Sequence, residues 1–259
     1  MRRVLFAFFG LVVFVNLSLA QRYVVDTVIG NVTVKSKNKV RSIEVGYVLK
    51  EGDTIITAKD SECYISVENK GYIRVEGRSS ITFEQIGRAF KGGSKDSITS
   101  TGSIFLSVKG IFGSGKALNV KTQTAFATVR GTEFVVEVEK KLTKVYVLEG
   151  EVAVAPLFST DEEELAKRTV QVKKGEKIEI SEIDVINATS FLKEGEDEEY
   201  YSFLEAKRKS LVASERERFE KRMKMLRDLQ RKRSQELERK RKEYLKNPSK
   251  LFEEEEEEE

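Results

Sequence analysis

One stretch of the chain has residue types and spacing that suggest phosphate chemistry. Residues 110–117 read GIFGSGKA, close to the loop G-x-x-x-x-G-K-[ST], whose backbone N–H groups cradle phosphates and whose last hydroxyl holds magnesium. Ala117 replaces that hydroxyl, and the ALNVKT that follows from it alternates like a strand where the loop requires a helix. We therefore interpret these residues as a β-turn and expect no nucleotide site.

The composition removes most other catalytic chemistry. The chain has no histidine and no tryptophan, and Cys63 is its single cysteine. Without histidine there is no imidazole base and no common zinc ligand set. Cys63 alternates with Ile65 and Val67 on one face of an expected strand, so we interpret it as a buried apolar residue and not as a reactive thiol. The sequence predicts no enzyme activity, no cofactor and no metal site.

Asp53 has the most informative context of the acidic residues. It follows Gly52 and precedes Thr54-Ile55-Ile56-Thr57, an expected strand. At such a position an aspartate side chain can accept hydrogen bonds from nearby backbone N–H groups in an Asx-type turn. We predict a structural role for Asp53 and not a catalytic one.

Two glycine turns between alternating segments of residues 124–154 form the most specific pattern. The residues of these turns are Arg130, Gly131, Thr132, Glu133 and Phe134 in the first, and Glu149 and Gly150 in the second. We expect Gly131 to supply a positive φ or a bulge, after which Phe134 resumes the alternation. We also expect Arg130 to form a structural ion pair with Glu133 or Glu149.

The elements that position these residues are predicted to be short strands. From Asp26 to about Ser181, apolar and polar residues alternate in segments separated by glycines and charged turns. This pattern predicts an all-β domain over 21–181, a sandwich or roll of many short strands or a short solenoid. Two segments interrupt it: residues 87–102 are rich in glycine and serine and predict a loop, and a Thr160-x-x-Glu163 capping box predicts a short helix within 157–168.

The chain after Ser181 changes character. We expect a linker over 182–197, a charged helix over 198–246 and an acidic, disordered tail over 247–259. Residues 205–246 hold 17 Lys or Arg against 8 Asp or Glu, whereas residues 253–259 are seven glutamates. The helix carries a sparse apolar stripe of Leu204, Leu211, Phe219, Leu226, Leu237 and Tyr244. This stripe can dock on the β-domain, pair with another chain as in a coiled coil, or stay partly exposed.

The amino-terminal segment has the pattern of a secretory signal peptide over residues 1–20. Arg2 and Arg3 precede an apolar run from Val4 to Val15, and Ser18-Leu19-Ala20 resembles a cleavage site. The run is shorter than the roughly 20 residues of a membrane span. We expect export to the periplasm or cell envelope, with an uncleaved membrane anchor as the alternative.

With these residues in view, residues 26–181 resemble the FecR domain family. Segment 46–57 (GYVLKEGDTIIT) is similar to an early motif of that family, and 102–105 to the opening of its central strand. The turns at 130–134 and 149–150 are similar to its most specific signature, and Lys174-Gly175-Glu176 to its closing turn. The resemblance implies an extracytoplasmic, non-enzymatic β-module. The chain lacks the amino-terminal helical segment and the small α/β domain of sigma-factor regulators, so that role is not transferred.

Two functions remain open at this point. The first is an exported β-scaffold that binds or tethers, with the basic helix contacting anionic envelope polymer or mediating homo-oligomerisation. The second is a periplasmic sensor or regulatory module that contacts a membrane signalling protein. An envelope-polysaccharide enzyme lacks a convincing set of catalytic residues, and interleaved glutamates in the helix argue against nucleic acid as a partner.

Overall fold

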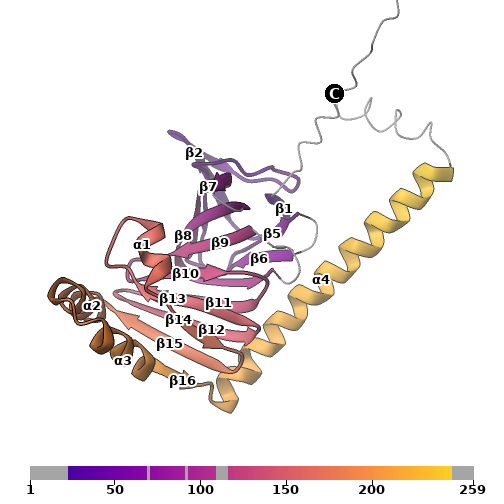
Figure 1. Ribbon diagram of the computed structural model, residues 1–259. Helices are drawn as coiled ribbons and strands as arrows, with labels where there is room; N and C mark the ends of the chain where they lie inside the picture. The colour runs from indigo at the N-terminus through magenta and orange to yellow at the C-terminus, as the bar shows by residue number, and fades with distance from the viewer. Residues whose placement is uncertain (1–22, 69–70, 91–92, 109–115, 247–259) are drawn as a thin grey trace, which may run out of the picture.

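The computed structural model describes residues 23–68, 71–90, 93–108 and 116–246 (Figure 1). The proposed signal peptide, the GIFGSG part of the phosphate-loop-like segment and the acidic tail lie outside these residues. Up to Ser181 the described chain is mainly β-strand, and the rest is mainly helical, so the prediction of a β-rich domain followed by a helical region is confirmed. Among the described residues, no helix is both long enough and apolar enough to cross a bilayer.

The strands form two hydrogen-bonded sheets that share one strand, β8 (Gly93–Ser107). We call the first sheet A; its order is β1 (Tyr23–Ile29), β5 (Glu62–Val67), β6 (Gly71–Val75), the end of β8, β11 (Glu133–Glu139), β12 (Leu142–Glu149), β15 (Glu176–Ser181) and β16 (Arg208–Ser210).

The second, sheet B, contains the start of β8. Its order is β3 (Lys39–Ser42), β2 (Val32–Ser36), β4 (Thr54–Thr57), β7 (Ser80–Phe90), β8, β9 (Lys116–Lys121), β10 (Ala125–Val129), β13 (Glu151–Pro156) and β14 (Val170–Lys173). The pair β8–β9 is parallel, and the other pairs named are antiparallel.

β8 changes sheets at Gly102, which has a φ of +75°. Residues up to Thr101 pair with β7, while Gly102 to Ser107 pair with β11. The main hydrophobic core lies between the sheets, and it takes Ile98 from the first half of β8 and Ile104 and Leu106 from the second. A left-handed glycine therefore lets one strand contribute to both layers of the core.

One sequence expectation for the β-domain is wrong, and another is right except for the residue that caps the helix. The segment 87–102, expected as a loop, forms the end of β7 and most of β8, apart from residues 91–92, which lie outside the described residues; Ile98, Thr99 and Thr101 suit a pleated surface, and the segment pairs with β7 along its length. The register shifts between Phe83 and Gln85 and between Gln85 and Arg88 accommodate its irregular pattern. The short helix α1 (Glu162–Lys167) does form, but its N-cap is Asp161, whose carboxylate accepts from Glu163 N, and not Thr160.

The segment expected as a linker over 182–197 is instead largely helical. α2 (Glu182–Glu194) begins at Ser181, whose backbone N–H donates to the Asp184 carboxylate at 2.8 Å, and ends at Gly195 in the left-handed region. Aspartate in place of the usual Glu or Gln of a capping box hid this start signal.

The charged region expected as one helix over 198–246 is divided. α3 (Asp197–Lys207) ends where Arg208, Lys209 and Ser210 pair with β15 as strand β16, and α4 (Ala213–Lys246) follows. Edge pairing with sheet A interrupts the helix. As a result Leu204, which was expected on the stripe of the long helix, belongs to α3 and packs into the main core.

Candidate functional site

The outer face of sheet A is covered by the first half of α4. In Figure 1, α4 starts beside β16, crosses the strands of this sheet and continues beyond them. We call the contact between the outer face of sheet A and α4 the seam. Its buried residues are Tyr64, Tyr72, Phe105, Val135, Tyr146 and Leu148 from the sheet, Phe219, Met223 and Leu226 from α4, and Leu211 just before it.

Strand alternation explains why the sheet has a second apolar face. In β5, Cys63 and Ile65 point to the main core while Tyr64 points to the seam; in β6, Ile73 and Tyr72 divide in the same way. On α4, Phe219, Met223 and Leu226 have i, i+4, i+7 spacing and form one face of the helix. A sheet with apolar side chains on both faces needs a cover on each, and α4 supplies the outer one.

Phe219 is the central apolar contact of the seam. It is fully buried, and its ring lies 4.6 Å from the ring of Tyr146 and 5.8 Å from that of Phe105. Both pairs are tilted, the arrangement in which aromatic rings attract beyond simple burial. Phe219 therefore holds α4 against β8 and β12 together.

Three arginines of α4 each pair with a glutamate in sheet A or directly after one of its strands. The distances are 3.5 Å for Arg218 to Glu137, 3.1 Å for Arg222 to Glu76, and 2.9 Å from Arg227 Nε to Glu133 Oε1. A fourth pair has the reverse polarity, Lys177 of β15 with Glu215 of α4 at 2.7 Å. The pairs fix the register of α4 on the sheet, because they reach it at four places: two positions of β11, one of β15 and the residue that follows β6.

Glu133 is the most buried of these carboxylates, with its side chain 5% exposed. Arg227 donates to both its oxygens, and the Ser107 hydroxyl also donates to it at 3.3 Å. The hydrogen bond to Glu133 raises the pKa of Arg227, so this guanidinium stays charged throughout the ordinary pH range.

This arrangement overturns the expected partner of Arg130. Glu133 pairs with Arg227, Glu149 pairs with Lys174 at 3.0 Å, and Arg130 is exposed with no ion pair among the described residues. The register explains it: Glu133 begins β11 and points to the outer face of sheet A, whereas Arg130 lies beyond the end of β10 in sheet B. No local sequence signal could identify a partner 94 residues away.

The other turn residues have structural positions. Gly131 has a φ of +90°, and the register of β11 with β12 shifts between Glu133 and Phe134, so the glycine and an irregularity occur together. Phe134 is fully buried in the main core, and Thr132 is buried beside Gly150, which also has a positive φ.

Asp53, next to Gly52 (φ +87°), also has a local structural role. Its carboxylate is buried and accepts from Lys50 N at 3.0 Å and from the Tyr47 hydroxyl at 2.9 Å. The bonded N–H precedes Asp53 by three residues, so this is not an Asx turn, in which the side chain bonds an N–H that follows. Asp53 closes the turn before β4.

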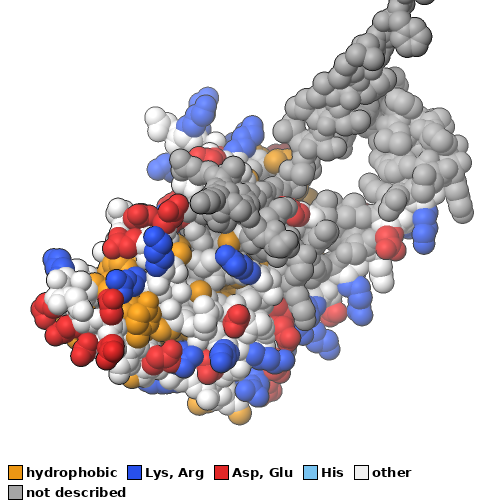
Figure 2. All heavy atoms as spheres, viewed as in Figure 1, with side chains coloured by type: hydrophobic (Ala, Val, Ile, Leu, Met, Phe, Trp, Pro, Cys, Tyr) orange, Lys and Arg blue, Asp and Glu red, His pale blue; other side chains and the backbone are white. Residues whose placement is uncertain are grey.

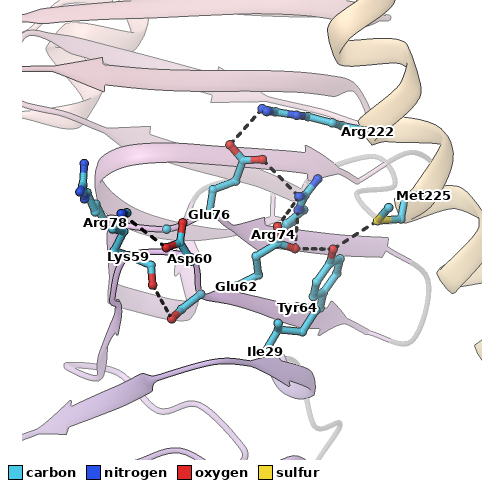
Figure 3. A pocket seen from close by; sticks show the side chains of 12 residues that line it. Ile29, Lys59, Asp60, Glu62, Tyr64, Arg74, Glu76, Arg78, Arg222 and Met225 are labelled. Carbon is cyan, nitrogen blue, oxygen red and sulfur yellow. Dashed lines mark hydrogen bonds and ion pairs between the residues drawn. The ribbon is translucent and has the colours of Figure 1, made fainter.

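A pocket of about 640 Å³ opens at the end of the seam, where α4 passes β5 and β6 (Figure 3). On its floor the Arg74 guanidinium donates to Glu62 at 2.6 and 3.1 Å and lies 3.3 Å from Glu76. Tyr64 donates to Glu62 at 2.7 Å and contacts the Met225 sulfur at 3.5 Å. The pocket wall is therefore shared between the β-domain and α4.

Glu62 and Tyr64 in this pocket have pKa values shifted away from neutrality. Burial raises the pKa of the Glu62 carboxyl, but hydrogen bonds from Arg74 and Tyr64 outweigh it and hold that pKa below its usual value. Burial and the bond to Glu62 raise the pKa of the Tyr64 hydroxyl, which stays protonated. Near neutral pH the Glu62 carboxylate is therefore charged and the Tyr64 hydroxyl neutral, and neither is tuned to exchange a proton there.

Neither a metal site nor a reactive thiol is present among the residues described. No group of three or more Asp, Glu or Cys in this part of the chain could hold a metal ion. Cys63 is fully buried, and burial raises the pKa of its thiol to about 12. The thiol stays protonated and packs as a small apolar residue.

Comparison with known proteins identifies a family over part of the chain. Residues 53–153 match the family described as FecR protein, and no curated protein matches the chain. Two crystal structures, at 1.65 and 2.50 Å, of "a putative anti-sigma factor" from Parabacteroides distasonis ATCC 8503 are similar to 49% of this chain, with 18% identity and a TM-score of 0.40. The chain spans about half of those structures, 54% of each.

Proposed function

We propose that this chain is an exported regulatory or sensor module that contacts a membrane signalling protein and catalyses no reaction, on the ground that residues 53–153 match the FecR family. The family match carries this proposal. The matched residues include β5, β6, β8, β11 and β12, the strands that form the floor of the seam. The domain and α4 therefore act as one unit in which the helix has a defined position.

The part of α4 after Leu229, which we call the arm, supplies the partner surface. Its described side chains include Arg231, Lys232, Arg239 and Lys242, all exposed. In Figure 1 the arm extends past the β-domain, and Figure 2 shows Lys and Arg side chains along it with a few acidic ones between them. Because the seam fixes the first half of α4, these cations are held in a set direction. A rigid cationic helix favours an acidic surface on the partner.

An anionic envelope polymer is the second candidate partner. The same exposed cations favour it, since a polyanion needs only charge and no shaped surface. The sequence alone placed this tethering function first. The FecR match now ranks the protein partner above it, because the match is to a family and the cations do not distinguish the two partners.

A sedimentation assay separates the two candidates. The full chain is mixed with membranes, with membranes pretreated with protease, and with purified cell wall. The arm variant replaces Arg231, Lys232, Arg239 and Lys242 by Gln; the control replaces the exposed Lys35, Lys37, Lys39 and Arg41 of the β2–β3 hairpin in the same way. Equal charge is thus removed from two ends of the molecule.

For a membrane protein partner, the full chain sediments with membranes, protease treatment abolishes this, and only the arm variant loses binding by tenfold or more. The polymer is supported if the full chain binds cell wall but not membranes, and if the arm variant no longer binds cell wall. Equal behaviour of the arm variant and the hairpin control contradicts both candidates.

A further inference from the structure

The pocket at the end of the seam has an apolar part that nothing in the described structure covers. Ile29 of β1 is 47% exposed and Met225 of α4 is 52% exposed, and both line this pocket together with Tyr64 (Figure 3). Two exposed aliphatic side chains from elements far apart in sequence therefore meet in one hollow. Such a hollow suits an apolar side chain of another segment.

The rim of the same pocket is cationic. Lys59 comes from the β4–β5 turn, Arg78 from the β6–β7 turn and Arg222 from α4. Of the acidic residues of the pocket, Glu62 and Glu76 are already bonded to arginines, and the exposed Asp60 lies 3.8 Å from Lys59.

The floor has an unused donor. The Arg74 side chain is 8% exposed, yet its Nη1 has no hydrogen-bond partner among the described residues. A buried donor without an acceptor is costly, and a ligand oxygen would satisfy it. The pocket therefore fits a segment that combines apolar side chains with carboxylates.

We propose that this pocket binds residues 249–259 of a second copy of the chain. That segment reads SKLFEEEEEEE, with Leu251 and Phe252 directly before seven glutamates. In this assignment the apolar pair packs on the exposed Ile29 and Met225, while the glutamates meet the cationic rim and the arm. No other part of the sequence places apolar residues directly before so long a run of carboxylates.

The reach of the chain favours an intermolecular contact. Met225 and Lys246 are separated by about 31 Å along α4, at roughly 1.5 Å per residue. From Lys246 to Phe252 an extended chain spans at most about 20 Å, at roughly 3.4 Å per residue. Even when the tail runs fully extended back along α4, the Cα atoms of Phe252 and Met225 of one copy stay about 11 Å apart, so the tail of a second copy fits the pocket better.

The contact joins two different surfaces, so the assembly is head-to-tail. Each copy offers one pocket and one tail, and repeated contacts form a ring if the rotation closes and an open chain if it does not. This self-association is independent of the proposed regulatory function: it needs the pocket and the tail, and no membrane protein.

A labelled synthetic peptide of residues 247–259 tests the proposal by fluorescence anisotropy with the full-length protein. We expect Ile29→Glu to weaken peptide binding tenfold or more, because it removes an apolar contact and adds a charge of the same sign as the tail. Val40→Glu is the control, since Val40 is 62% exposed on the β2–β3 hairpin. A second peptide carries Leu251→Ser and Phe252→Ser.

The expected results are loss of binding for Ile29→Glu and for the serine peptide, and unchanged binding for Val40→Glu. Sedimentation velocity should show concentration-dependent association of the full chain and a monomer for Ile29→Glu. Equal binding of the two peptides would reduce the contact to charge alone and overturn the proposal. So would a peptide that binds Ile29→Glu as well as it binds the unchanged protein, or that binds neither.

Discussion

Replacing Phe219 by alanine is expected to lower the free energy of unfolding by about 3–5 kcal/mol, the usual cost of deleting a fully buried phenylalanine ring. The ring is completely buried and contacts Phe105 and Tyr146 on two different strands. No neighbouring part of the sheet can move to fill the space, because these strands also form one wall of the main core. The measurement is equilibrium unfolding in urea, monitored by the near-ultraviolet circular dichroism of the tyrosines.

Met225→Ala is the matched control for Phe219→Ala. Met225 lies on the same helix less than two turns away and is 52% exposed. Its truncation should cost less than about 1 kcal/mol, as is usual for surface positions. If Phe219→Ala costs no more than Met225→Ala, then α4 is not held to sheet A in the way described.

Replacing Gly102 by valine is expected to prevent stable folding or to lower the free energy of unfolding by several kcal/mol. The φ of +75° disfavours any residue with a Cβ, and β-branched residues such as valine most of all. This backbone strain lowers the free energy of unfolding by about 1–3 kcal/mol. A Cβ at this position would also lie 2.3 Å from Ser79 Oγ and 2.8 Å from the Arg78 carbonyl oxygen. Overpacking of this kind typically costs a further 1–3 kcal/mol or so.

Gly46→Val separates the two causes of destabilisation, the unfavourable φ and the steric clash. Gly46 has a φ of +89°, but a Cβ there would meet nothing within 4 Å. Gly46→Val should therefore lower the free energy of unfolding only by the cost of the unfavourable φ. Gly102→Val, which adds a steric clash, should be clearly the less stable variant in thermal unfolding. Equal stability of the two variants would mean that the crossing of β8 between the sheets does not depend on the close approach to Ser79.

The sequence predicts the local elements of this protein better than their partners. Alternation and glycine turns locate β5, β6, β11 and β12, but they do not show that these strands bury both faces, one in the main core and one in the seam. The hairpin of β7 and β8 is missed because serine, threonine and glycine also make loops. The start of α2 is missed because Asp184 occupies the capping-box position at which Glu or Gln is usual.

Long-range pairing is the part that sequence reasoning could not supply. Glu133 and Arg227 are joined only by the fold, so a nearby arginine, Arg130, was the natural but wrong partner. One signal was available: β6 carries Tyr72 on one face and Ile73 on the other, and such a strand needs a cover on both sides. The stripe of Phe219 and Leu226 was the segment able to supply it.

In-cell photo-crosslinking from the arm tests the central claim most directly. A photoreactive amino acid replaces Lys232 on the arm in one strain and Lys39 on the β2–β3 hairpin in another, both exposed positions. Irradiation should give a discrete adduct with an integral membrane protein from position 232 and none from position 39. No protein adduct from position 232, or the same adduct from both positions, would contradict a regulatory module that meets its partner through α4.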